Sequence, residues 1–87
     1  MVKPEDETKI ILQEIDKAQK LYDEMDKYII VKINHETETD SKSFEFQGMF
    51  NDSTESIEAT HSLTTLNQVL KELLNNGYAV NFDYEKY

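Results

Sequence analysis

The chain has 87 residues, which is enough for one small domain, and we expect residues 1–87 to fold as a single unit. It carries 18 Asp and Glu residues against 9 Lys and no Arg, and this net charge of −9 argues against direct binding to nucleic acid or to an anionic membrane. The absence of cysteine excludes disulfides, thiolate metal sites and a cysteine nucleophile. No apolar run approaches the ~20 residues of a membrane helix and no signal-peptide pattern is present, so we expect a cytoplasmic protein.

Residues 4–27 have the pattern of an amphipathic helix. Pro4 suits a first helical turn, and the acidic residues 5–7 favour the positive end of the helix dipole. Apolar residues then recur at spacings of three and four, at Ile11, Ile15, Ala18, Tyr22 and Met25. The pattern predicts a first helix over about 4–27 with one apolar stripe.

After residue 27 the apolar period changes to two. Residues 28–35, 43–50 and, more weakly, 56–60 alternate as strands do, and the polar segments between them are typical of turns. These three segments predict an antiparallel meander. The side chains expected to face the core are Ile29, Val31, Ile33, Phe44, Phe46, Phe50, Ile57 and Ala59.

A second helix is predicted from Ser62, which suits an N-cap, to the Asn76–Gly77 pair, which suits a left-handed C-terminal turn. Its apolar stripe consists of Leu63, Leu66, Val69, Leu70, Leu73 and Leu74. Residues 78–85 alternate again and predict a final strand, parallel to and beside residues 28–35. The sequence therefore predicts a two-layer α+β fold of order α-β-β-β-α-β, with both helices packed on one face of the sheet.

The negative charge is concentrated in the middle of the chain. Residues 1–33 carry a net −2, residues 34–60 a net −6 and residues 61–87 a net −1. The acidic residues of the middle segment form the candidate protein-binding site, and they are Glu36, Glu38, Asp40, Glu45, Asp52, Glu55 and Glu58. If residues 36–40 are extended, the first three carboxylates project from one side at intervals of ~6.6 Å, similar to two phosphate steps along DNA. Glu45, Glu58, Asp83 and Glu85 are expected on the outward face of the sheet, with Lys32 as its cation.

No motif for catalysis or for a cofactor is found. The two histidines, His35 and His61, have no metal-ligand spacing, and two isolated glycines cannot form a phosphate-binding loop. An 87-residue two-layer domain also offers little room for a deep pocket that would raise the pKa of a carboxylate. We therefore expect no enzyme activity, no catalytic residues, no metal and no cofactor.

The predicted order α-β-β-β-α is similar to that of double-stranded-RNA-binding domains, which place basic residues at the start of the second helix. Here that position reads SLTTLNQ and contains no cation. The similarity therefore stops at topology, and RNA binding is not expected.

In size, acidity and absence of cysteine, the chain resembles the small inhibitors encoded by phages and other mobile elements, including DNA-mimicking anti-CRISPR proteins. The resemblance implies a non-enzymatic inhibitor that binds the cationic nucleic-acid-binding surface of a nuclease or a related enzyme, in the host cytoplasm if the protein is phage-encoded. Its partner would be a basic nucleic-acid-binding protein, and a monomer is expected in preference to a homodimer.

A second interpretation stays open, in which the acidic residues only keep the protein soluble. The chain is then a structural or regulatory interaction module, with a homodimer joined through an exposed edge strand or the helical stripe as one form.

Overall fold

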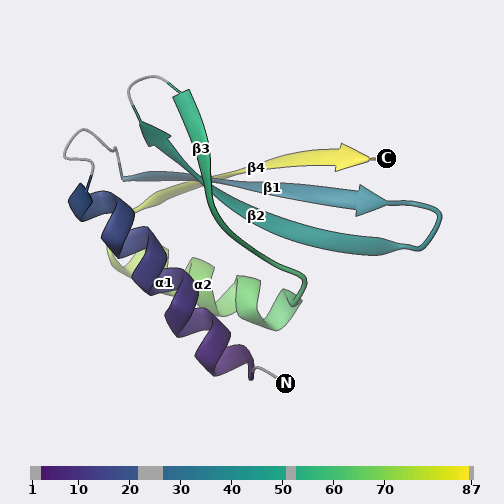
Figure 1. The fold of residues 1–87 in the computed structure, drawn as a ribbon, viewed down its shortest axis with the longest axis horizontal. Coiled ribbons are helices and arrows are strands. Elements are labelled where there is room, and N and C mark those ends of the chain that lie inside the picture. The colour runs from purple at the N-terminus through teal and green to yellow at the C-terminus, as the bar shows by residue number, and fades with distance from the viewer. Residues whose placement is uncertain (1–2, 22–26, 51–52, 87) are drawn as a thin grey trace.

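The computed structural model describes residues 3–21, 27–50 and 53–86, and it has the predicted order of elements (Figure 1). The elements are helix α1 (Pro4–Leu21), strands β1 (Tyr28–Glu36), β2 (Ser41–Phe50) and β3 (Ser53–Thr60), helix α2 (Leu63–Asn75) and strand β4 (Ala79–Lys86). The α+β prediction is therefore confirmed. In the described part of the chain, neither helix has the length and hydropathy needed to cross a membrane.

Helix α1 begins at Pro4 as predicted, with three acidic residues in its first turn. Ile11 and Ile15 are buried, and Ala18 packs against the core. The prediction extended this helix to residue 27, but the described helix ends at Leu21. Tyr22 and Met25, which the predicted stripe included, lie outside the described residues.

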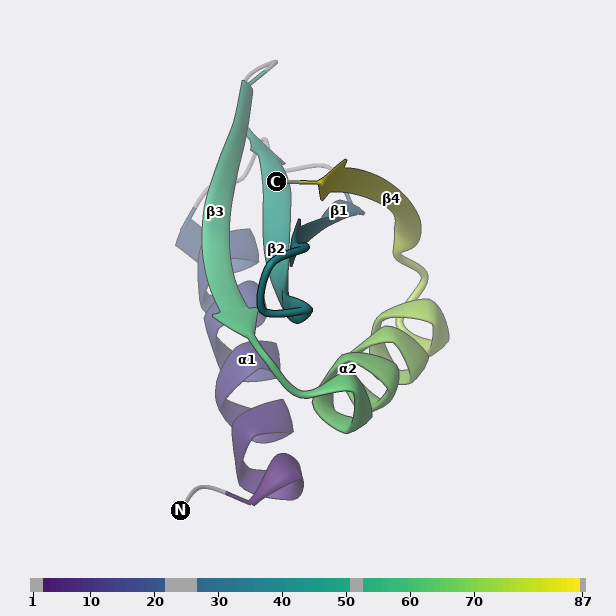
Figure 2. The ribbon, with the colours of Figure 1, turned by 90° about the vertical axis from the view of Figure 1, so that its right-hand side faces the viewer.

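The sheet has the strand order β3-β2-β1-β4. The β1–β2 and β2–β3 pairs are antiparallel, and β4 lies parallel to β1, as the sequence predicted. The register aligns Val31 with Phe46 on one side and with Phe82 on the other, so these three side chains share the face towards the helices. Both helices pack on this face, α1 towards β3 and α2 towards β4 (Figure 2).

Strand β3 contains an irregularity that reverses part of the predicted pattern. Phe46 pairs with Glu58 and the next residue, Gln47, pairs with Ser56, so Ile57 is an extra residue in β3. Ile57 packs against the core as predicted, but Ala59 is exposed and pairs with Glu45 on the outward face. The inward prediction for Ala59 and the outward prediction for Glu58 are therefore wrong, because a bulge shifts the alternation by one residue.

Helix α2 has caps at both ends. The side chain of Ser62 accepts a hydrogen bond from the backbone N–H of Thr65 at 3.1 Å, as an N-cap does. At the other end Gly77 has a φ of 82°, a conformation that glycine adopts without steric cost. The turn at Gly77 reverses the chain into β4.

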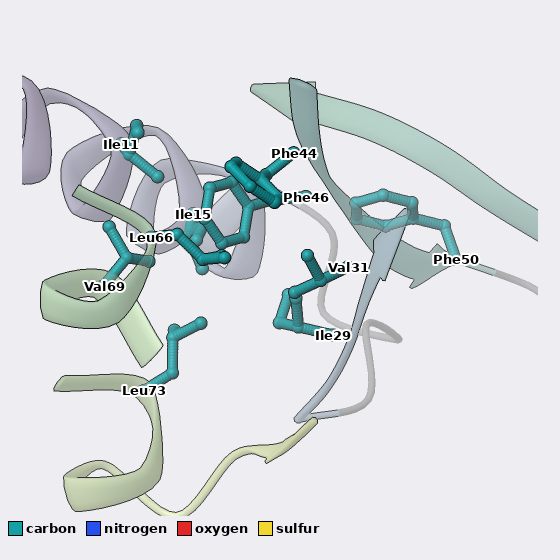
Figure 3. Close-up of a cluster of buried hydrophobic side chains, with 10 residues drawn as sticks. All are labelled: Ile11, Ile15, Ile29, Val31, Phe44, Phe46, Phe50, Leu66, Val69 and Leu73. Atoms are coloured by element: carbon teal, nitrogen blue, oxygen red, sulfur yellow. The ribbon is translucent and has the colours of Figure 1, made fainter. Parts of the chain in front are cut away.

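The core lies between the sheet and the two helices (Figure 3). Its ten buried apolar side chains come from both helices and from β1 and β2, and they are Ile11, Ile15, Ile29, Val31, Phe44, Phe46, Phe50, Leu66, Val69 and Leu73. The Thr8 hydroxyl lies 2.7 Å from Oε1 of Gln68 and joins α1 to α2. The core is thus centred on the two middle strands, whereas β4 contributes only the partly buried Val80.

Candidate protein-binding site

The outward face of the sheet carries a group of acidic side chains around one lysine. The register places Lys32 of β1 directly between Glu45 of β2 and Asp83 of β4. The Nζ atom of Lys32 also lies 3.3 Å from Oε1 of Glu85. Three of the four residues predicted for this face are therefore brought together, in a 3:1 ratio of acid to base. We call Glu45, Asp83 and Glu85, with Lys32 among them, the acidic face.

Glu36 and Glu38 lie at the end of the β1–β2 hairpin. Glu36 pairs with Ser41 at the end of β1, where alternation along the strand gives it the same orientation as Lys32. Glu38 is exposed in the four-residue turn formed by residues 37–40. This hairpin projects beyond both helices (Figure 1), which leaves its carboxylates accessible.

Asp40 departs from the extended geometry considered for residues 36–40. It has a φ of 53°, in the left-handed region that Asp tolerates, so the three carboxylates do not form a straight row. Its Oδ1 atom lies 2.7 Å from Nε2 of His35, and Nδ1 of that ring lies 2.6 Å from the hydroxyl of Tyr84. The hydrogen bond from His35, followed by the charges of His35 and Lys42, lowers the pKa of Asp40 below its ordinary value of 3.8.

The Asp40–His35–Tyr84 chain joins the hairpin turn to the last strand. A carboxylate, an imidazole and a hydroxyl in a row also activate nucleophiles in enzymes. Here the side chain of Asp40 is 84% exposed and Tyr84 is 54% exposed, so water surrounds both ends. Such an exposed arrangement lacks the exclusion of water that strengthens electrostatic catalysis. We therefore interpret these three hydrogen-bonded side chains as a structural link between the hairpin turn and β4.

Glu55 and Glu58 lie apart from the acidic face. Both are on β3, where the register pairs them with Gly48 and Phe46 on the helix side of the sheet. Oε1 of Glu58 accepts a hydrogen bond from the backbone N–H of Ala59 at 3.1 Å. Asp52, the remaining predicted site residue, lies outside the described residues. The six of the seven predicted residues that the structure describes thus divide among the β1–β2 hairpin, the outward face of the sheet and the edge strand β3.

The sheet carries most of the net charge. Residues 28–60 and 79–86 have 9 acidic residues and 3 lysines, a net −6, whereas the two helices together have 6 and 4, a net −2. Among the described residues of the strands, Glu36, Glu45, Asp83 and Glu85 are oriented outward with Lys32, which gives this face a net charge of −3. The sequence located the excess in residues 34–60, and it is the parallel placement of β4 that adds Asp83 and Glu85.

A cleft of about 440 Å³ lies on the helix side of the sheet, next to the hairpin turn. Its lining combines three apolar side chains, Ile33, Phe44 and Leu63, with four polar ones, Asp40, Lys42, His61 and Tyr84. Its residues come from four separate segments, so no local pattern in the sequence indicates it. Among the residues that the structure describes, no three His, Asp or Glu side chains are arranged to hold a metal ion.

Comparisons with protein-family models, with curated proteins and with solved structures found no match.

Proposed function

We propose that this protein is a non-enzymatic inhibitor that binds the cationic nucleic-acid-binding surface of a nuclease or a similar enzyme. The observation that carries the proposal is the acidic face, in which Glu45, Asp83 and Glu85 surround Lys32 on the side of the sheet opposite the helices. The exposed Glu36 and Glu38 extend the negative surface along the hairpin. A cationic groove on a partner is the complement of such a surface.

The spacing within the acidic face suits a partner that normally binds phosphates. Asp83 and Glu85 are two residues apart on one strand, a distance of ~6.6 Å along its axis. Two phosphate steps along one DNA strand are ~6.8 Å. Both separations are shorter than the Debye length of ~8 Å at physiological salt, so the fields of these carboxylates reinforce one another. Association would therefore be fast at low salt and would weaken as salt is added.

The proposal is tested with two variants that lose the same number of charges. The first, Glu45→Gln/Asp83→Asn/Glu85→Gln, neutralises the acidic face, and the second, Glu55→Gln/Glu58→Gln/Glu72→Gln, neutralises three acids elsewhere. Each protein is immobilised and exposed to a bacterial lysate at low salt, bound proteins are eluted with duplex DNA, and the nuclease activity of each eluate is assayed with and without the free protein. We expect wild type and the second variant to release the same basic protein and to inhibit it.

The acidic-face variant should capture at least tenfold less of that protein. Equal capture by both variants would contradict the assignment of the acidic face. A retained partner that duplex DNA does not displace would contradict binding at a nucleic-acid-binding surface.

A further inference from the structure

Exposed apolar side chains gather around strand β4. Of the six large apolar side chains that are exposed among the described residues, four belong to α2 and β4: Leu63, Leu74, Phe82 and Tyr84. Phe82 pairs with Val31 and shares its orientation towards the helix side, yet it is 53% exposed, whereas Val31 is fully buried. The side of the molecule formed by α2 and β4 therefore exposes a group of apolar side chains to water, as surfaces that bind another protein often do.

The two helices explain this exposure. Gln68 of α2 bonds to Thr8 of α1, so that flank of α2 is covered. At 100° per residue, Leu63, Leu70 and Leu74 lie on the opposite flank, towards β4. Figure 2 shows α1 on the other side of α2 from β4, with β4 at the outer end of the sheet. Leu70 packs against the core, whereas Leu63 lines the same cleft as Tyr84, so this flank of α2 lies beside β4.

The backbone of β4 is also suited to pairing. The N–H of Ala79 donates to the carbonyl of Lys27 at 2.9 Å, so the odd-numbered residues of β4 direct their backbone groups towards β1. The N–H of Phe82 instead donates to its neighbour, Oδ1 of Asn81, at 2.9 Å. By alternation, Val80, Phe82 and Tyr84 direct their backbone groups towards the free edge. No register shift interrupts the β1–β4 ladder, so this edge is regular.

In one antiparallel register of β4 with a second copy of itself, no two like charges lie directly opposite each other. With the twofold axis at Phe82, Val80 lies opposite Tyr84 of the second copy, and Asn81 lies opposite its Asp83. The first is an aromatic and β-branched pair, and the second joins an amide to a carboxylate. An axis at Asp83 would oppose two identical carboxylates, and an axis at Tyr84 would oppose Asp83 and Glu85.

From this complementarity we propose that the protein forms a homodimer through antiparallel pairing of its β4 strands about a twofold axis at Phe82. Two four-stranded sheets then form one continuous sheet. The α2 helices of the two copies lie beside each other on the same side of that sheet, where the flanks with Leu63 and Leu74 cover each other. Because both copies use the same surface in this contact, the assembly is complete with two copies. The resemblance led us to expect a monomer in preference to a homodimer, and the repulsion between two copies that each carry −9 is reduced by salt.

The dimer has a consequence for the outward face. A twofold axis perpendicular to the sheet leaves both acidic faces on the same side, so Asp83 and Glu85 of the two copies become neighbours of one negative surface. Dimerisation does not rest on the proposed inhibitory function. The two also depend oppositely on salt, because salt strengthens the association of two copies that each carry −9 and weakens binding of a cationic partner.

Analytical ultracentrifugation of the full chain tests the dimer. At 150 mM salt, wild type should change from the monomer mass of 10.2 kDa to twice that mass as the concentration rises from 1 μM to 500 μM. Phe82→Lys and Phe82→Glu should each remain monomeric, because the axis places two like charges against each other. A control with lysine on the other edge, Thr54→Lys, should dimerise as wild type does.

An equimolar mixture of Phe82→Lys and Phe82→Glu provides the sharpest readout, because only an axis at this residue places the two opposite charges together. We expect the mixture to recover the dimer mass while each variant alone does not. Circular dichroism of each variant verifies that the monomer is folded. A wild type that is monomeric throughout the concentration range, or a dimer that either folded Phe82 variant leaves intact, would overturn the proposal.

Discussion

The two edges of the sheet differ in how they are protected from other chains. Strand β3 begins with four exposed polar residues, is bulged at Ile57, and uses the carboxylate of Glu58 to bind the backbone N–H of Ala59. Strand β4 is regular and exposes Phe82 and Tyr84. The edge-facing backbone N–H of Phe82 donates to the side chain of Asn81. Bulges and charges are common means of preventing edge pairing. Strand β4 also carries charges, at Asp83, Glu85 and Lys86, but it has no bulge, so its backbone is the one suited to pairing with a second strand.

The two edges also differ in how the helices cover them. Helix α1 packs near β3, and its Glu7 carboxylate accepts a hydrogen bond from the hydroxyl of Thr60, which is buried. On the β4 side, α2 leaves Leu63 and Leu74 60% exposed. The acidic face and the apolar edge therefore adjoin at β4, and Asp83 belongs to both, since it is part of the acidic face and lies opposite Asn81 of the second copy in the proposed register.

The largest effect is expected from a comparison of two phenylalanines on the helix side of the sheet. Phe46 is fully buried, so Phe46→Ala should lower the free energy of unfolding by ~3–5 kcal/mol. Phe82→Ala should lower it by less than ~1 kcal/mol at a concentration where wild type is monomeric, since half of that side chain is already in water. Urea denaturation monitored by circular dichroism measures both values. Equal losses would mean that β4 is part of the core.

A smaller effect is expected at the turn that leads into β4. Gly77 has a φ of 82°, and a Cβ atom there would meet nothing within 4 Å, so the cost of Gly77→Ala is conformational. We expect a loss of ~1–2 kcal/mol in the same denaturation experiment. Gly77→Asn provides the control, because Asn tolerates this conformation and should lose less. If Ala and Asn cost the same, the left-handed backbone is not what stabilises this turn.

At the start of α2, Ser62→Ala should cost ~1 kcal/mol, because the N–H of Thr65 loses its side-chain acceptor. Ser62→Asp keeps an acceptor at the N-cap and should retain most of the stability. Thermal unfolding of the three proteins compares them directly, and an Ala variant as stable as wild type would contradict the assigned cap. Leu63 and Leu74 belong to this helix, so the same measurement shows how much the N-cap stabilises the helix that carries them.

The smallest effect concerns the link between the hairpin and β4. The pKa of Asp40 is lowered mainly by the hydrogen bond from His35, so this contact stabilises the fold fully at pH values above the ordinary pKa of 3.8. The stabilisation is lost as the pH falls through the lower pKa of the folded state. An NMR titration of the Asp40 carboxyl should give a pKa below 3.8 in wild type and a higher pKa in His35→Gln, where the charge of Lys42 is the lowering cause that remains. His61→Gln should leave the titration of Asp40 unchanged. An unaltered pKa in His35→Gln would show that the contact is not formed in solution.

Much of the fold follows from local patterns that the sequence displays. The start of α1 at Pro4, the alternation in β1 and β2, the Ser62 cap and the turn at Gly77 each depend on residues close together in the chain. The face of β3 was harder to predict, since a bulge inserts one residue without any glycine or proline to mark it. Alternation alone assigned Ala59 to the core and Glu58 to the outside, whereas the register gives the reverse.

The candidate site was predictable only in part. The outward face with Glu45, Asp83, Glu85 and Lys32 was predicted, because the sequence already indicated that the last strand lies parallel to and beside residues 28–35, and the register confirms this placement. The contact of His35 with Tyr84 joins residues 49 positions apart, and no spacing rule indicates it. Residues 36–40 alternate as a strand would, yet four of them form the hairpin turn.

Hydrogen exchange at the free edge of β4 reports directly on whether two copies pair through this strand. The backbone N–H groups of Val80 and Tyr84 point away from β1, so they exchange readily in a monomer and become bonded in the proposed dimer. The account predicts that their exchange slows at least tenfold between 1 μM and 500 μM protein, while amides of β3 change little. Exchange at Val80 and Tyr84 that does not depend on concentration would contradict it.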